Sequence, residues 1–136
     1  MKRLALDIGD VWTGVAISDE LGMFARPYKT VKATELISFL RQLLQDEPIG
    51  TIVIGYPQTI GGQESEQTRK TLRIKQTLEK EFPGYNFALW DERYTSQQAQ
   101  ELKKVRSKED KLKIHAIAAA FILDTYLAHE RAKSKI

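Results

Sequence analysis

The sequence predicts a single α/β domain built around a mixed five-stranded sheet. Its first part holds three short extended segments in succession, and the rest alternates between helical and extended patterns. Three strands in succession favour an antiparallel start, whereas strands separated by helices favour parallel pairing. The gaps between segments are only a few residues long and none has the composition of a linker, so residues 1–136 are expected to form one domain.

Each predicted strand is a short apolar run that ends at a turn residue. The runs are residues 4–8, 14–18, 23–28, 51–54 and 85–90. Gly9 lies between the first two runs, which predicts a β-hairpin. Pro27 favours an edge position for the third, because proline cannot donate a ladder hydrogen bond. The fourth run is β-branched and stops at Gly55, which is typical of a buried parallel strand.

Apolar residues at helical spacing predict the helices. The expected helices cover residues 35–47, 65–82, 96–103 and 114 onward. Thr34 is expected to cap the first helix and Ser65 to begin the second, which ends before Pro83. Residues 104–113 are expected to form a charged loop before the last helix.

Composition limits the classes of function. With 42% hydrophobic and 29% charged residues, the chain resembles a globular domain and not a disordered tail. It contains no cysteine, which excludes disulfides, thiolate zinc sites and a cysteine nucleophile, and favours a reducing cytoplasm. No stretch approaches the roughly 18 apolar residues of a membrane helix, and an early charge argues against a signal peptide. We therefore expect a cytoplasmic protein that does not enter a membrane.

Positive charge is concentrated in the last quarter of the chain. The net charge is +3, and residues 101–136 carry nine Lys and Arg against five Asp and Glu. Such a stretch favours binding to a nucleic-acid backbone, although a solvated surface loop has the same pattern. The candidate substrate contacts are Arg69, Lys70, Arg93, Lys104 and Arg106.

Asp7 is the first candidate for chemistry, because it interrupts an apolar run in an expected interior strand. An unpaired carboxylate there costs several kcal/mol. It needs a positive partner: in a structural role this is a set of turn amides, Arg3 or Arg93, and in a functional role Asp7 is a metal ligand or an acid that positions a phosphate. Asp91 and Glu92 directly follow the fifth strand. Adjacent strand residues point to opposite faces, so only one of the two is expected to face the same site as Asp7.

Two carboxylates that converge from separate strands favour a hard divalent cation, Mg²⁺ or Mn²⁺. They indicate phosphodiester hydrolysis, in which two such ions activate water and stabilise the leaving oxygen. A competing interpretation is a phosphate-binding turn at Asp7, Gly9 and Gly14, as in actin-like ATPases. Those ATPases need a second domain, which 136 residues hardly supply.

Four short segments spread along the whole chain match one family pattern. They are residues 7–9 with 14–18, residues 55–57 with Gly61, residues 91–96 with Ala99, and Ala118-Ala119 with Ile122-Leu123 and Tyr126-Leu127. In order and spacing they resemble the YqgF/RuvX family, whose members are described as pre-16S rRNA nucleases and as Holliday junction resolvases. The resemblance implies a ribonuclease H-like fold and a metal-dependent hydrolase.

The resemblance also implies the site residues. The family's acids are an aspartate on the first strand, the glutamate of an Asp-Glu-Arg motif and an aspartate that opens the last helix. The first two correspond to Asp7 and Glu92, and His115 stands where the third is expected. A neutral imidazole in that place favours Mn²⁺ or another transition metal over Mg²⁺. Asp10 also departs from the family and is either a substitute carboxylate or an ordinary turn residue.

The expected function is therefore metal-dependent endonucleolytic cleavage in the processing of pre-16S rRNA during ribosome biogenesis. Resolution of four-way DNA is the alternative, and it requires a symmetric homodimer. A second alternative, indicated by His115, is a nucleic-acid-binding or assembly protein with a degraded site. The sequence leaves open whether the chain is a monomer or a homodimer.

Overall fold

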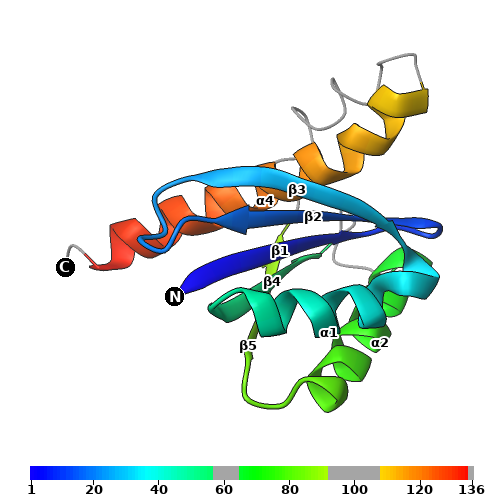
Figure 1. Cartoon of the computed structure of the whole chain (residues 1–136), viewed down its shortest axis with the longest axis horizontal. Coiled ribbons are helices and arrows are strands. Elements are labelled where there is room, and N and C mark those ends of the chain that lie inside the picture. Colours follow the sequence, from blue (N-terminus) through cyan, green and yellow to red (C-terminus); the bar gives the residue numbers. More distant parts are fainter. Residues whose placement is uncertain (57–64, 92–107, 135–136) are drawn as a thin grey trace.

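The computed structural model describes residues 1–56, 65–91 and 108–134. One sheet has the strand order β3-β2-β1-β4-β5. The strands are β1 (Lys2–Ile8), β2 (Trp12–Ser18), β3 (Ala25–Lys32), β4 (Ile49–Tyr56) and β5 (Asn86–Asp91). The helical elements are the 3₁₀ turn η1 (Ala33–Glu35), α1 (Leu36–Asp46), α2 (Glu66–Glu81) and α4 (Lys108–Ser134). Figure 1 shows α4 on one side of the twisted sheet and α1 and α2 on the other.

The sheet is mixed, which confirms the predicted fold class. β1 pairs antiparallel with β2 and parallel with β4, and β4 pairs parallel with β5. The three parallel strands therefore end at the same edge of the sheet. Asp7 lies one position before the end of β1, and Asp91 is the last residue of β5. Ligands of open α/β sheets gather at such an edge.

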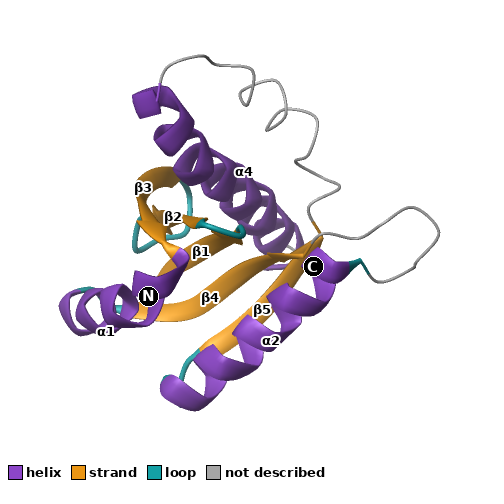
Figure 2. Cartoon of the chain, turned by 90° about the vertical axis from the view of Figure 1, so that its right-hand side faces the viewer, coloured by secondary structure: helices purple, strands orange, loops and turns teal. Residues whose placement is uncertain are grey.

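The two faces of the sheet carry side chains of different size. Leu4, Leu6 and Ile8 alternate along β1 and pack with large aliphatic residues of α1 and α2. Ala5 faces the other way, toward α4. The core on that side contains Ala5, Ala16, Val53, Ala119, Ile122, Leu123 and Leu127. Figure 2 shows the sheet between these two layers of helix.

β3 lies at the edge of the sheet, as Pro27 predicts, but it runs on to Lys32, beyond the predicted end. Its register against β2 shifts, because Val15 pairs with Lys29 and Ala16 pairs with Pro27. Tyr28 is therefore the extra residue of a β-bulge. Proline is tolerated at such a bulge on an edge strand, where its missing N–H costs no ladder bond.

Two predicted helix starts are wrong. Thr34 does not cap α1, because it lies inside η1, and neither element has a side-chain cap. The Ala33 N–H instead donates to the Val11 carbonyl at 2.8 Å, so contact with the β1–β2 hairpin fixes the start. α4 begins at Lys108, so residues 108–113 are helical and not loop; charges of both signs in this stretch are compatible with a helix.

The second helix begins as predicted, since Ser65 Oγ accepts the Thr68 N–H at 3.1 Å. The short helix expected over residues 96–103 lies outside the described residues. Among the helices that the structure describes, none is both long and apolar enough to span a membrane.

Candidate active site

Asp7 lies on the α4 face of the sheet, close to the edge where the parallel strands end. Leu6 and Ile8 on either side of it belong to the core under α1 and α2, so alternation directs Asp7 the other way. Ala5, two positions earlier, packs in the α4 core and agrees with this assignment. The Asp7 side chain is half-buried. The charge that interrupts the apolar run is thus a carboxylate under the start of α4.

α4 lies directly against the sheet backbone beside Asp7. Gly14 of β2 is the residue paired with Asp7. A Cβ at Gly14 would lie 1.8 Å from the His115 carbonyl oxygen and 2.8 Å from the Ala116 nitrogen. Any side chain here would push α4 away, so glycine is required for this close approach. The α4 backbone at His115 therefore lies against the ladder partner of Asp7.

His115 belongs to the stripe of α4 that faces the sheet. Ala119 and Ile122, four and seven positions later, share its face of the helix and are almost fully buried. His115 itself is half-buried. The histidine that the family resemblance singled out therefore lies on the same side of the sheet as Asp7.

The Asp7 carboxylate makes no hydrogen bond or ion pair with the part of the chain that the structure describes. Arg3, one expected partner, pairs instead with Glu130 of α4, with 3.2 Å between Nε and Oε1. Arg93, the other, lies outside the described residues. A half-buried carboxylate that Arg3 leaves uncompensated is the kind of group that a bound cation stabilises.

Asp91 points to the opposite face from Asp7. It pairs in register with Tyr56, two positions after Ile54, which belongs to the core under α1 and α2. Trp90, next to Asp91, packs in the α4 core. By alternation, Asp91 therefore faces the α2 side. Of the two adjacent acids, Asp91 is not the one that shares a face with Asp7.

Trp90 joins β5 to α4, a role that sequence reasoning missed. Its Nε1 donates to Thr125 Oγ1 at 2.8 Å. Its ring lies edge-on to Tyr126, with centroids 5.6 Å apart, and 5.1 Å from the His129 ring. The end of β5 is thereby fixed beneath α4. A tryptophan directly before an acidic pair was the available signal in the sequence.

The start of α2 lies against the turn between β1 and β2. Lys70 Nζ pairs with Asp10 Oδ1 at 3.0 Å, and Gln67 Nε2 donates to the Ile8 carbonyl at 2.9 Å. Asp10 lies in the turn between β1 and β2, and its side chain is largely exposed. Arg69 is exposed on the same helix. A groove of about 480 Å³ here is lined by Asp10, Ser65, Glu66, Gln67, Lys70 and Arg73.

The predicted site residues thus divide into three groups. Asp7 pairs with Gly14 and the His115 backbone lies against Gly14 on the α4 face, whereas Arg69 and Lys70 lie on α2, beyond the β1–β2 turn. The remaining predicted residues, Glu92, Arg93, Lys104 and Arg106, lie outside the described residues. Within the described ranges, no three His, Asp or Glu side chains are grouped closely enough to hold a metal ion.

Comparison with known proteins identifies the family. The RuvX family, described as Holliday junction resolvase, matches residues 1–129. The chain belongs to the RuvX family. It is 37% identical to a "Putative pre-16S rRNA nuclease" of Rubrobacter xylanophilus, over 90% of this chain and 89% of that protein. A protein of the same name from a Sulfurihydrogenibium species is 38% identical over 93% of this chain and 89% of its own length.

Solved structures confirm the expected ribonuclease H-like fold. The structure titled "T. thermophilus RuvC in complex with Holliday junction substrate" superposes with a TM-score of 0.59 at 12% identity. The match covers 96% of this chain and 96% of that one. At that identity the likeness concerns the arrangement of strands and helices alone.

Proposed function

We propose that this RuvX member is a metal-dependent endonuclease that hydrolyses phosphodiester bonds in pre-16S rRNA, acting in the cytoplasm as one domain over residues 1–136. The observation that carries the proposal is the half-buried Asp7 carboxylate, left uncompensated by Arg3, under the helix that carries His115. Members of its family are nucleases. A carboxylate in that position is suited to hold a cation against a phosphate group.

The donor set fits a divalent ion. Asp7 and His115 would supply an oxygen and a nitrogen, and Glu92 would supply a second carboxylate. Asp91 faces the α2 side, which leaves Glu92 as the acid of that pair assigned to the site. One imidazole among two carboxylates favours Mn²⁺ over Mg²⁺. When bound, such an ion lowers the pKa of a coordinated water and stabilises charge on the scissile phosphate.

The basic residues would hold the substrate backbone. Arg69 and Lys70 lie on α2 beside the β1–β2 turn, which follows the end of β1 where Asp7 lies. Arg93, Lys104 and Arg106 are assigned the same role by their charge and their place in the sequence. Contacts of this kind position a nucleic acid and are screened by salt.

The choice of pre-16S rRNA follows the names of the relatives at 37% and 38% identity. The family description instead favours four-way DNA, and this second candidate requires two sites related by a two-fold axis. A monomer in solution would argue against junction resolution. Resolution of a four-way junction needs paired cuts in two strands, and one domain carries a single candidate site.

The decisive experiment compares three carboxylates. Cleavage of a precursor rRNA fragment and of a four-way DNA junction is measured with Mn²⁺ and with Mg²⁺ for the wild type, Asp7→Asn, Glu92→Gln and Asp91→Asn. The first two variants are expected to lose about three orders of magnitude in rate. Asp91→Asn, the matched control on the other face, should stay within a few fold. Equal losses at Asp91 and Glu92 would refute the assignment, and the substrate that is cleaved decides between RNA and DNA.

The variant His115→Asp tests the remaining alternative, a nucleic-acid-binding or assembly protein with a degraded site. A restored carboxylate should shift the metal preference toward Mg²⁺ and leave Mn²⁺-dependent cleavage of the same order. Cleavage by His115→Asp together with none by the wild type would establish the degraded site instead. Circular dichroism controls for folding, because His115 lies against the sheet.

A further inference from the structure

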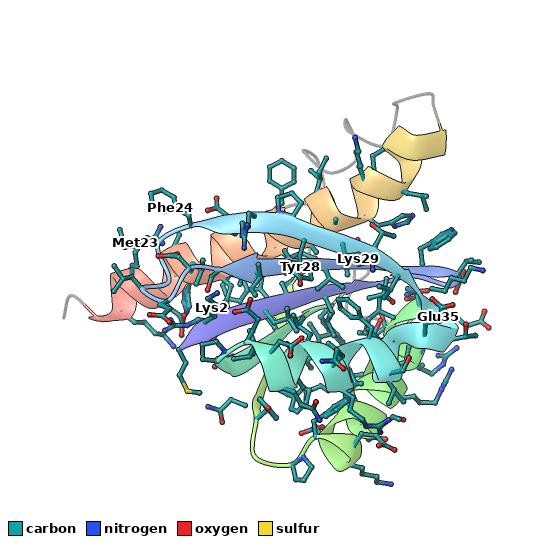
Figure 3. The ribbon with its side chains drawn as sticks, in the orientation of Figure 1. Lys2, Met23, Phe24, Tyr28, Lys29 and Glu35 are labelled. Atoms are coloured by element: carbon teal, nitrogen blue, oxygen red, sulfur yellow. The ribbon has the colours of Figure 1, made fainter. Side chains whose placement is uncertain are left out.

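The edge strand β3 combines exposed aromatic and basic side chains. Tyr28 is 43% exposed, and its ring lies 6.2 Å from the ring of Phe39 on α1. Lys29 Nζ stands 5.8 Å from the centre of the Phe39 ring, within cation–π distance. Lys32, at the end of β3, is also exposed. Figure 3 shows Tyr28 and Lys29 side by side along β3, with Glu35 beyond the end of the strand.

A groove lies on each side of this strand. One, of about 320 Å³, separates β3 from the start of α4 and is lined by Tyr28, Thr30, Leu112, Lys113 and Ala116, among others. The other, of about 490 Å³, lies between β3 and α1 and includes Trp12, Lys29, Lys32, Glu35 and Phe39. Tyr28 lines the first groove and contacts, through its ring, an aromatic residue of the second.

The charge of this surface suits an anion. The charged residues on β3 and lining the two grooves, within the described ranges, are Arg26, Lys29, Lys32, Lys113 and Glu35. Four are cations and one is an acid. Phosphate groups are therefore attracted to both grooves, and the exposed Tyr28 ring offers a face to a base between them.

The surface lies two strands away from Asp7 in the sheet. Thr30 of β3 pairs with Gly14, and Gly14 pairs with Asp7, so the three residues form one row across the sheet. Two strand spacings amount to roughly 10 Å. Ala116, which lines the β3–α4 groove, also lies against Gly14. The α4 backbone lies over this row, because it contacts Gly14 at His115 and its Leu112 carbonyl accepts a hydrogen bond from Thr30 Oγ1, so a strand in the groove would have to pass around α4 to reach Asp7.

We propose that this surface, the β3 platform (Tyr28, Lys29, Lys32, Phe39 and Lys113), binds a single-stranded segment of nucleic acid. A base stacks on Tyr28, and Lys29, Lys32 and Lys113 contact the flanking phosphates. The role of the segment as substrate rests on the proposed nuclease function, whereas the binding does not. An added protein strand fits this edge poorly, because Pro27 lacks an N–H and the bulge at Tyr28 breaks the ladder.

The test measures binding without cleavage. Fluorescence anisotropy follows a labelled single strand of about ten nucleotides, as RNA and as DNA of the same sequence, against Asp7→Asn protein. Adding Tyr28→Ala should weaken binding roughly tenfold, and Tyr28→Phe should restore it, because stacking needs only the ring. Adding Lys29→Ala should make the affinity less dependent on salt. The slope of log affinity against log salt concentration should fall by about the amount expected for one lost phosphate contact.

Matched controls lie elsewhere on the surface. Phe24→Ala removes an exposed ring from the β2–β3 turn, and Lys80→Ala removes an exposed lysine from the end of α2. Neither should change binding by more than a factor of two or so. Affinity that is insensitive to Tyr28→Ala, or equally sensitive to Phe24→Ala, would overturn the platform. So would gel filtration in which Tyr28→Ala breaks a dimer while oligonucleotide affinity stays the same.

Tryptophan fluorescence gives an independent reading. The chain has two tryptophans, so in Trp90→Phe protein the remaining one is Trp12, which lines the β3–α1 groove. A single-stranded oligonucleotide should quench it, and Tyr28→Ala should reduce the quenching at equal concentration. Tyr28-dependent binding without cleavage by the wild type would refute the nuclease and keep the platform. Cleavage with Tyr28-independent binding would refute the platform alone.

Discussion

The two faces of the sheet come from the same strands but carry side chains of different size and polarity. Toward α1 and α2, β1 presents Leu4, Leu6 and Ile8, which fill a core of large aliphatic side chains. Toward α4, the same strand presents Ala5 and Asp7, and β2 presents Ala16 and Gly14. Small residues let the backbone of α4 approach the sheet and leave room for a carboxylate.

Within the single strand β1, the residues on one face stabilise the fold, and the carboxylate on the other face is the candidate for chemistry. Burial of each large aliphatic side chain contributes on the order of 2 kcal/mol to folding. A half-buried carboxylate without a counter-charge from Arg3 lowers stability, which is the usual cost of a functional site. Neighbouring residues of β1 should therefore respond to substitution in opposite ways.

The largest effect is expected for Leu6→Ala, which removes a fully buried side chain. The free energy of unfolding should fall by about 4 kcal/mol, since the cavity cannot close between the sheet and its helices. Urea unfolding measures the loss, and cleavage per folded molecule should stay near the wild-type rate. Asp7→Asn is the control from the other face, with an unchanged or raised unfolding midpoint. A destabilised Asp7→Asn would mean that the carboxylate has a structural partner.

Gly14→Ala should affect both properties, because its new methyl group would lie 1.8 Å from the His115 carbonyl oxygen. α4 must then move, and we expect a loss of about 3 kcal/mol in unfolding free energy together with a loss of cleavage. Gly50→Ala is the matched control, since the atoms nearest its methyl would belong to the Met1 side chain, at 3.2 Å and beyond. Comparable losses at both glycines would show that the α4 contact has no special importance.

The smallest effect concerns Tyr126 on α4. Burial, and then the charge of Glu130, raise the pKa of the Tyr126 phenol above its usual 10.0. The neutral phenol is thus favoured in the folded protein, and its contribution to stability is lost as pH rises through the raised pKa. Tyr126→Phe should flatten the alkaline fall in unfolding midpoint between about pH 9 and about pH 11. An unchanged alkaline fall in the variant would exclude Tyr126 as its cause.

Much of the fold followed from local pattern. The apolar runs located all five strands, and Ser65 marked the start of α2 through an ordinary side-chain cap. The predicted cap at Thr34 was wrong, because the start of η1 is set by a hydrogen bond from the Ala33 N–H to the Val11 carbonyl of the hairpin. Contacts between distant segments override a capping preference of this kind.

The candidate site was less accessible to sequence reasoning. Asp7 was found because a charge in an apolar run is anomalous, and alternation at Trp90 places Asp91 on the face away from α4. His115 had no local signal and was singled out by family resemblance alone. The importance of Gly14 depends on α4, which lies against it from the far end of the chain, and no short pattern encodes that contact.

The docking of α4 also sets the order in which the protein matures. β1 and β2 are synthesised first and can pair locally, whereas His115, Thr125 and the Arg131 that binds the Gly22 and Met23 carbonyls all belong to the last element described. Chains fold from the N-terminus as they leave the ribosome. The face that holds Asp7 is therefore closed only after translation of α4.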